Sequence, residues 1–421
     1  MTLRATHPEP IRRLVIGALI GAALVVPLIG AATPSQADTW PEPSDWASVL
    51  EEATGQTVYF HAWGGDTRIN DYIRWAGDQV EARYGVTVEH VKVSDTANVV
   101  SQVLAEKTAG KTEGGSVDLV WINGENFANM KANGLLAEAS WADQLPSWRY
   151  VDVDNKPTVV TDFTVPTDGL EAPWGMAQLV FMYDTDITTE PPLSAEALLK
   201  WAQANPGRVT YPSPPDFVGS TFLKQILTET AGDPSVLQQE ATNESFAAIE
   251  AGLFGYLEAL HPHLWRSGET FPQNYPNMIN LMADGEIDLA FAFNPAAASN
   301  AIAAGDLPET VRTYVFEAGT IGNTHFVAIP FNANAGAGAL VFADFLMSGE
   351  AQARKQDPTV WGDPTVLDVA ALPEEDRAAF AKLERGIATL APEDLSPTLP
   401  EPHPSWMVRI EEAWLSRFGV R

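Results

Sequence analysis

The chain has 421 residues, of which 55 are acidic and 25 basic, so its formal net charge at pH 7 is −30. A surface this negative repels phosphate backbones and argues against a nucleic-acid partner. Cysteine is absent, which excludes disulfides, thiolate zinc sites, cysteine nucleophiles and a lipid anchor on an N-terminal cysteine.

The first 37 residues have the order typical of an export signal. Basic residues, among them Arg12 and Arg13, precede an apolar run over residues 14–29, and small residues lead up to Ala37. The run is shorter than the roughly 20 residues that a membrane-spanning helix needs, so we expect cleavage after Ala37 rather than a retained anchor. The arginine pair leaves general secretory and twin-arginine export both open. Because an exported protein without a lipid anchor would diffuse away from a single-membrane cell, we expect a periplasmic location.

From residue 57 on, short apolar segments alternate with segments of helical periodicity. Strands are predicted over 57–63, 86–93 and 117–122. A helix that ends near Gly85 has an apolar face formed by Ile69, Tyr72, Ile73, Ala76 and Val80. A second helix is predicted over 96–109, and its core-facing residues are expected to be Val99, Val100, Val103 and Leu104. Strands that alternate with helices indicate a parallel sheet with helices on both faces.

The same alternation returns later in the chain. Strands are predicted over 179–183, 209–211 and within 285–293, and helices over 195–204, 220–230, 334–347 and from a cap at Asn243 to Leu260. The chain after residue 37 is longer than one compact core usually holds, so we expect two α/β lobes.

Two segments, 172–185 and 310–330, join these blocks and are expected to form a hinge, near 174–182 and 313–324. The predicted domains are a signal peptide over 1–37, lobe 1 over 38–176 and 320–355, lobe 2 over 177–319, and a C-terminal helical segment over 356–421 that packs on a lobe.

Several stretches resemble a known family. A late segment reads AGALVFADFLMSGEAQAR over 337–354, and it is similar to a late helix followed by a short SxEAQ helix in solute-binding proteins of ABC importers. The resemblance extends over roughly residues 57–355. It implies a two-lobed type II periplasmic-binding-protein fold, in which each lobe is a mainly parallel sheet flanked by helices and the ligand cleft lies between the lobes.

Three further stretches are similar to the YnjB-like subgroup, whose transport system is described as an importer of thiamine. They read VYFHAWGGDTRINDYIRWA, VDLVWINGENFANMKANGLL and APWGMAQLVFMYD. The resemblance implies a monomer without cofactor or enzymatic activity. Such a protein binds a small molecule and delivers it to an ABC transporter permease in the inner membrane.

Ligands of open parallel sheets bind beyond the carboxyl ends of the strands, and this rule selects the candidate site. Two predicted strands end in a tryptophan that is followed by glycine and a carboxylate, which gives the first-lobe candidates Trp63, Gly64, Gly65, Asp66, Trp121, Asn123, Gly124 and Glu125. The crossing segments and the second lobe supply Trp174, Asp216, Phe217, Gly219, Ser220, Asn294, Thr324 and His325. The alternative is structural: the tryptophans fill a core, and Asp216 only caps a helix.

A flat cation such as thiamine would suit these residues. Trp63 would stack on the ring, and Asp66 or Glu125 would supply the counter-charge. Asn123 or Asn294 would bind a pyrimidine edge. Two alternatives stay open. A periplasmic enzyme on a small metabolite or sugar would use Asp66 and Glu125 for acid-base chemistry. A ferric-iron binder of the same fold would need converging oxygen ligands, commonly tyrosines, and the sequence has no adjacent tyrosine pair.

Other motifs predict no site. His261 and His263 are two residues apart and do not share a helical face, so a metal pair is not expected. GAGAL over 336–340 lacks the third glycine of a dinucleotide fingerprint. Neither GxSxG nor HExxH occurs, so hydrolase chemistry has no signature.

Overall fold

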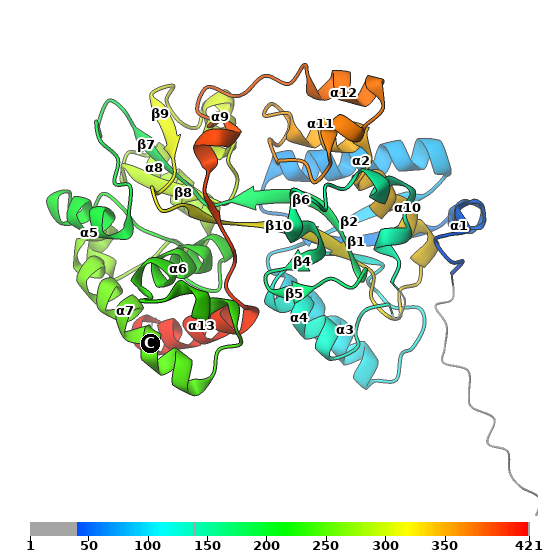
Figure 1. Ribbon diagram of the computed structural model, residues 1–421, viewed down its shortest axis with the longest axis horizontal. Coiled ribbons are helices and arrows are strands. Elements are labelled where there is room, and N and C mark those ends of the chain that lie inside the picture. The colour runs from blue at the N-terminus through cyan, green and yellow to red at the C-terminus, as the bar shows by residue number, and fades with distance from the viewer. Residues whose placement is uncertain (1–39, 138–139, 420–421) are drawn as a thin grey trace, which may run out of the picture. The chain divides into compact units, whose positions relative to one another are not determined.

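The computed structural model describes residues 40–137 and 140–419 (Figure 1), so the predicted signal peptide lies outside the described residues. Within them, the chain forms a six-stranded, a three-stranded and a two-stranded sheet. The six-stranded sheet consists of β1 (Thr57–Trp63), β2 (Thr87–Val93), β3 (Leu119–Ile122), β6 (Glu171–Gln178), β10 (Thr320–Ala328) and β11 (Thr398–Leu399). Its order is β11-β10-β3-β1-β2, with β6 also paired with β10.

The first three strands of this sheet are parallel, as the alternation of strands and helices predicts. β10 returns antiparallel to both β3 and β6. Helices around the sheet are α1 (Trp46–Ala53), α2 (Thr67–Tyr84), α3 (Thr96–Thr108), α4 (Glu125–Ala132), α10 (Gly336–Leu346) and α11 (Gly349–Gln356). One core joins α1, α2 and α10 to β1, and another joins α3 and α4 to β3 and β10. Helices therefore cover both faces of the sheet.

The predicted apolar face of α2 is buried, and the helix ends at Gly85 in the left-handed conformation (φ 69°), which glycine adopts without steric cost. On α3, Val99, Val100 and Val103 are buried, but Leu104 is 41% exposed. The prediction for Leu104 was wrong, since only the three valines form the buried face of α3.

The three-stranded sheet has the order β8-β7-β9 and is antiparallel in both pairings, which differs from the mainly parallel sheet expected for the second lobe. Its strands are β7 (Val180–Asp184), β8 (Leu289–Ala292) and β9 (Val311–Tyr314), and the helices around it are α5 (Ala195–Ala204), α6 (Phe217–Thr230), α7 (Asn243–Leu260), α8 (Tyr275–Ala283) and α9 (Ala297–Ala304). These elements surround a core of their own.

Three local predictions in this block differ from the structure. Residues 209–211 do not form a strand, because only Val209 makes an isolated parallel bridge, to Leu289, and Pro212 has no N–H to continue the ladder. The cap of α7 is Thr242 rather than Asn243: the Thr242 Oγ1 accepts the Ser245 N–H at 3.0 Å. The helix α6 begins at Phe217, earlier than the predicted residue 220.

The chain passes between the two larger sheets three times. β6 leads into β7 through Leu179, β9 leads back into β10, and β6 and β10 pair with each other. The third passage is the C-terminal segment, which contributes Trp361 to the core of the six-stranded sheet and Trp406 to that of the three-stranded sheet. Between them, β11 pairs with β10. The segment thus packs on both cores, whereas the sequence predicted packing on one.

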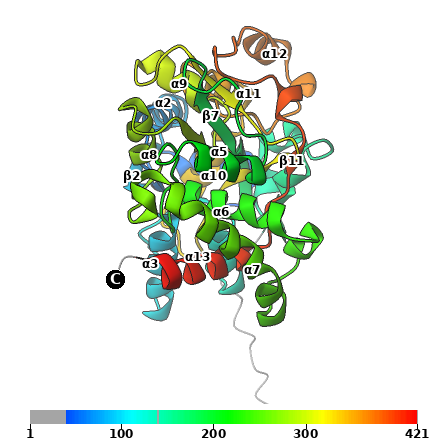
Figure 2. The ribbon, with the colours of Figure 1, turned by 90° about the vertical axis from the view of Figure 1, so that its left-hand side faces the viewer.

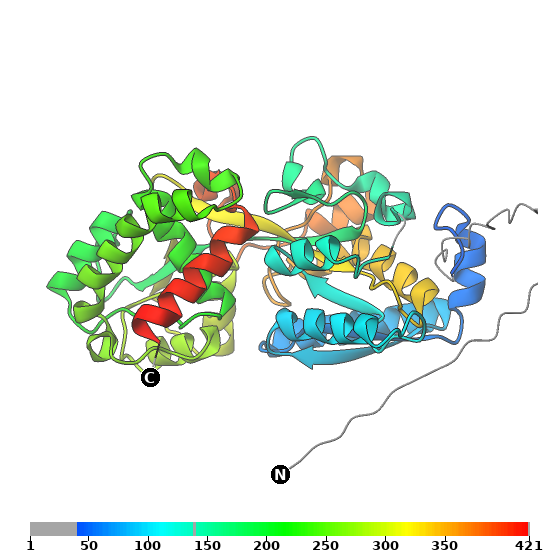
Figure 3. The same ribbon diagram turned by 90° about the horizontal axis from the view of Figure 1, so that it is seen from below.

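The last helices of the chain are α12 (Glu374–Phe380) and α13 (Pro404–Phe418). Figure 2 shows α13, in red, beside α6 and α7, and Figure 3 shows it reaching toward the six-stranded sheet, where it contacts α4. Trp406, Met407, Ile410 and Trp414 of α13 are buried. The remaining two-stranded sheet consists of β4 (Thr161–Asp162) and β5 (Val165–Pro166). No helix of the described residues is long and apolar enough to cross a membrane.

Candidate functional site

The loop after β1 packs closely against the Trp63 indole and against Lys92 of β2. A Cβ at Gly65 would lie 2.2 Å from Cζ2 of Trp63, and one at Gly64 would lie 2.6 Å from Cβ of Lys92. The indole therefore folds against the loop, and the two glycines are needed for this close approach. Trp63 is half-buried against the core. Asp66 caps α2, since its Oδ1 accepts the Arg68 N–H at 2.7 Å.

An aromatic cluster lies at the carboxyl end of β3. Trp121 and Trp174 meet edge to face at 4.9 Å between ring centroids, and His325 lies 5.3 Å from Trp121. Trp361 stacks on His325 at 5.9 Å, and Tyr72 lies 5.6 Å from Trp361. Trp174 is completely buried, and its Nε1 has no hydrogen-bond partner. The structure thus brings together three predicted residues and two, Tyr72 and Trp361, that the sequence analysis missed.

A buried ion pair lies next to this cluster. The Lys355 ammonium binds the Asp363 carboxylate, and the Nε2 of His325 lies 3.1 Å from Oδ2 of Asp363. Burial lowers the pKa of Lys355, although the charge of Asp363 opposes this effect. Sequence analysis missed both charged residues. The signal was present, because Trp361, Gly362 and Asp363 repeat the order tryptophan, glycine, carboxylate.

A second group of polar residues surrounds the start of α4. The Gly124 N–H donates to Oδ2 of Asp162 at 2.6 Å, and a Cβ at Gly124 would lie 2.7 Å from the Phe163 ring. Glu125 has a buried Oε2 without a hydrogen-bond partner, and burial raises the pKa of its carboxyl to about 7. Across from it, the Lys224 ammonium of α6 donates to Oε2 of Glu401 at 2.6 Å.

The helix α6 contributes predicted residues to the same region. The Ser220 hydroxyl donates to Oε1 of Glu411 at 2.5 Å. The Phe217 ring lies 5.2 Å from the Lys224 ammonium. A Cβ at Gly219 would lie 2.0 Å from the Pro212 carbonyl oxygen, so glycine allows α6 to pack closely on the preceding segment.

The other predicted residues have structural partners. Asp216 accepts N–H bonds from Val218 and Gly219 with one oxygen and from Tyr275 with the other, so both its oxygens are used for capping. Asn294 donates to the Trp361 carbonyl at 3.3 Å and accepts from the Ala296 N–H. The Thr324 hydroxyl is 2.8 Å from that of Thr158, and Asn123 is half-buried. The predicted residues therefore do not all meet: some lie in the aromatic cluster, some around the start of α4, and those from Trp63 to Asp66 in the loop after β1.

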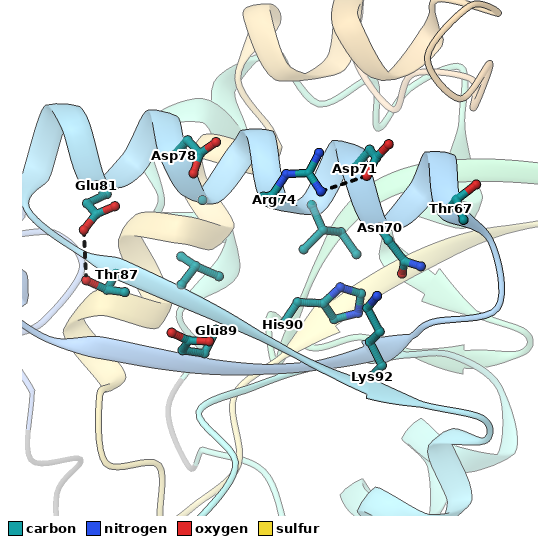
Figure 4. A pocket seen from close by; sticks show the side chains of 13 residues that line it. Thr67, Asn70, Asp71, Arg74, Asp78, Glu81, Thr87, Glu89, His90 and Lys92 are labelled. Atoms are coloured by element: carbon teal, nitrogen blue, oxygen red, sulfur yellow. Dashed lines mark hydrogen bonds and ion pairs between the residues drawn. The ribbon is translucent and has the colours of Figure 1, made fainter.

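A groove lies elsewhere, between α2 and the edge strand β2 (Figure 4). It has a volume of about 350 Å³, and Asn70, Arg74, His90 and Lys92 are among its lining residues. None of the predicted ligand residues lines it. Because it lies along the side of the sheet rather than beyond the strand ends, it does not meet the geometric rule for ligands of parallel sheets. In the described part of the chain, no cluster of three or more His, Asp or Glu side chains suits a metal ion.

Comparison with known proteins identifies relatives. Residues 75–382 match the family model described as bacterial extracellular solute-binding protein. Protein YnjB of Escherichia coli (strain K12) is 47% identical over 377 residues, which cover 90% of this chain and 95% of YnjB.

Solved structures show the same fold. PotD, the spermidine/putrescine ABC transporter substrate-binding protein of Streptococcus pneumoniae, is 16% identical with a TM-score of 0.57, over 86% of this chain and 98% of PotD. The periplasmic binding protein AfuA of Actinobacillus pleuropneumoniae, with fructose-6-phosphate bound, is 15% identical with a TM-score of 0.59, over 87% of this chain and 100% of AfuA. The predicted class, an α/β type II periplasmic-binding-protein fold, is confirmed.

Proposed function

Because the chain belongs to the bacterial extracellular solute-binding proteins, we propose that it captures a small solute by closure of two lobes and delivers it to an ABC transporter permease. Proteins of this family serve transport and are not enzymes, so the alternative of a periplasmic enzyme is dropped. The lobes would comprise residues 38–176 with 320–355, and 177–319. The protein would act as a monomer in the periplasm after removal of residues 1–37.

The paired crossing strands β6 and β10 support closure about a hinge. Both belong to the six-stranded sheet, and each connects within a few residues to a strand of the three-stranded sheet. Burial and the charge of Asp66 raise the pKa of Tyr275, so the start of α2 lies near the start of α8. A rotation within 174–182 and 313–324 would change the distance between these two helix starts.

A planar cation such as thiamine is our first candidate for the solute. The half-buried Trp63 offers an aromatic surface, and the carboxyl group of either Asp66 or Glu125 would offset a positive charge. PotD, a protein of the same fold, is described by its cationic solutes spermidine and putrescine, whereas AfuA holds a sugar phosphate. The fold alone therefore accommodates solutes of either charge, and the preference for one charge depends on the side chains at the site.

Mass spectrometry of the gently purified protein, under native and then denaturing conditions, tests the function by identifying any solute that comes with it. Small-angle scattering with and without that solute should show a smaller radius of gyration in its presence. An unchanged radius at proven saturation would contradict hinge closure. Thiamine is the first compound to titrate by calorimetry, and no binding at millimolar concentration would remove it while leaving the transport role intact.

A further inference from the structure

Five titratable side chains from separate segments meet where α4, β4, α6 and the C-terminal segment come together. We name as the Glu125 cluster the side chains Glu125, Asp162, Lys224, Glu401 and Glu411. Lys224 and Glu401 are directly bonded. Asp162 interacts electrostatically with Glu125, Glu401 and Lys224, and Glu125 does so with Glu411 and Lys224. The cluster lies between the two larger sheets, since α13 contacts both α4 and α6.

The Glu125 cluster has one cation for four carboxyl groups, which is too little positive charge to balance them when they are ionised. Lys224 is its single cation, and the Lys224 ammonium donates to Glu401. Burial raises the pKa of each of the four carboxyl groups, because the desolvation of the charged form outweighs the attraction of one ammonium. An added cation would make the ionised carboxylates favourable.

Two oxygens of the cluster lack a hydrogen-bond partner. Asp162 is 1% exposed, and its Oδ1 has no partner, while its Oδ2 accepts the Gly124 N–H. That bond holds the carboxyl group beside the first residue of α4, which is Glu125, whose own buried Oε2 also has no partner. Buried acceptors are rarely left unpaired, because they lose their bonds to water without replacement. When the two carboxyl groups are ionised, these oxygens therefore require N–H or O–H donors.

Aromatic rings next to the cluster favour a cation as well. The Lys224 ammonium lies 4.5 Å from the centroid of Phe163 and 5.2 Å from that of Phe217. These distances are within the range in which an aromatic face attracts a cation. Gly124 lies against the Phe163 ring and donates its N–H to Asp162, so a donor bound to Asp162 would lie near this ring as well.

We propose that the Glu125 cluster is a subsite for the positively charged part of the transported solute, with Oε2 of Glu125 and Oδ1 of Asp162 as acceptors. The inference rests on the proposed solute-binding function and narrows its substrate class to organic cations with N–H donors. Lys224 remains bonded to Glu401 and is not displaced. The counter-charge is thus assigned to Glu125 and Asp162, and Asp66 keeps its role as the cap of α2.

Cation binding at this subsite is coupled to proton release. Glu125 faces Glu411 of α13, Lys224 of α6, Asp162 of β4 and Asp95 before α3, and Oε1 of Glu125 accepts a bond from Asn126 of its own helix. Its pKa of about 7 leaves a large fraction protonated at neutral pH. A cation beside it lowers that pKa, so the affinity for the cation increases as pH rises from 6 to 8.

The test compares Glu125→Gln and Asp162→Asn with the wild-type protein, using thiamine, putrescine and spermidine as cationic probes and fructose-6-phosphate as an anionic one. Both substitutions preserve shape and remove charge. We expect at least a tenfold loss of affinity for whichever cation binds the wild type. Titration calorimetry at pH 7 in phosphate and in Tris should show proton release by the wild type and much less by Glu125→Gln. The matched control is Glu258→Gln, on the exposed side of α7, which should bind like the wild type.

Melting temperatures establish that each variant is folded, and Asp162→Asn serves if Glu125→Gln does not fold. Unchanged cation affinity in a folded variant overturns the subsite. Closure of the wild type on a neutral or anionic solute, with no response to any cation at millimolar concentration, also overturns it but preserves the solute-binding function. A wild-type protein that binds no solute of any charge, including none carried through purification, contradicts the proposed function itself.

Discussion

Gly175 lies so close to Asp363 that a Cβ at this position would be 2.0 Å from Oδ2 of the carboxylate. The same Cβ would be 2.0 Å from Nε2 of His325. Both neighbours are buried, so neither can move into solvent. The absence of a side chain on β6 therefore makes room for the buried ion pair.

We expect Gly175→Ala to destabilise the protein by about 1–3 kcal/mol or more, the usual cost of overpacking a core. Urea unfolding measures the change. The control is Gly255→Ala on α7, where an added Cβ would meet nothing within 4 Å. Because alanine favours a helix interior more than glycine by up to about 1 kcal/mol, the control should be neutral or more stable. Equal stabilities for the two variants would contradict the packing argument.

Lys355→Met should be strongly destabilising. The substitution leaves the Asp363 carboxylate buried without its ammonium partner, and breaking a buried pair in this way typically costs about 3–5 kcal/mol. Lys200→Met removes an exposed pair with Glu196 and should hardly change the melting temperature. Thermal and urea unfolding of both variants measure the difference. A Lys355→Met protein as stable as the wild type would show that the pair is dispensable.

The tryptophans Trp63 and Trp174 should respond differently to truncation. Trp174 is completely buried, so Trp174→Ala should cost about 3–5 kcal/mol of stability. Trp63 is half-buried at a strand end, so Trp63→Ala should cost less stability and weaken solute binding by about 1–3 kcal/mol. Titration calorimetry beside thermal unfolding separates the two effects. Full affinity in a destabilised Trp63→Ala protein would assign Trp63 to the core alone.

We expect the free energy of unfolding of the solute-free protein to decrease as the pH rises, because of Glu125. Its folded pKa of about 7 is above the unfolded value, so the folded state binds more protons between about pH 4.5 and 7. The stabilisation that the protonated Glu125 gives to the folded state is complete below about pH 4.5 and is lost as the pH rises through 7. The free energy of unfolding of Glu125→Gln, relative to that of the wild type, should therefore increase by roughly 1–3 kcal/mol when the pH is raised from 5 to 8. Urea unfolding at both pH values checks this, and a pH-independent difference would contradict it.

Removal of the signal segment is testable on the exported protein. The order of basic, apolar and small residues up to Ala37 predicts a mature chain that begins near Asp38. Intact-mass analysis of periplasmic material measures the start directly. Retention of residues 14–29 would indicate a membrane-anchored protein.

Local sequence patterns alone determined many of the elements. The strand over 57–63 and the helix over 195–204 were predicted with the boundaries that the structure shows. The apolar periodicity lies within these segments, and the capping or turn residues lie directly beside them, so both can be read without knowing what packs against the segment. The family resemblance depended on such local stretches as well.

Only the tertiary structure determines which residues and strands contact one another across long distances in the sequence. Lys224 and Glu401 are 177 positions apart, and no local pattern indicates that they bind each other. The same holds for the contact of Trp361 with His325 and for the antiparallel pairing of the three-stranded sheet. Periodicity shows which face of an element is apolar, but the element that covers this face is selected by packing of the whole chain. For this reason the sequence identified Glu125 as a candidate residue, and only the fold placed Asp162 beside it.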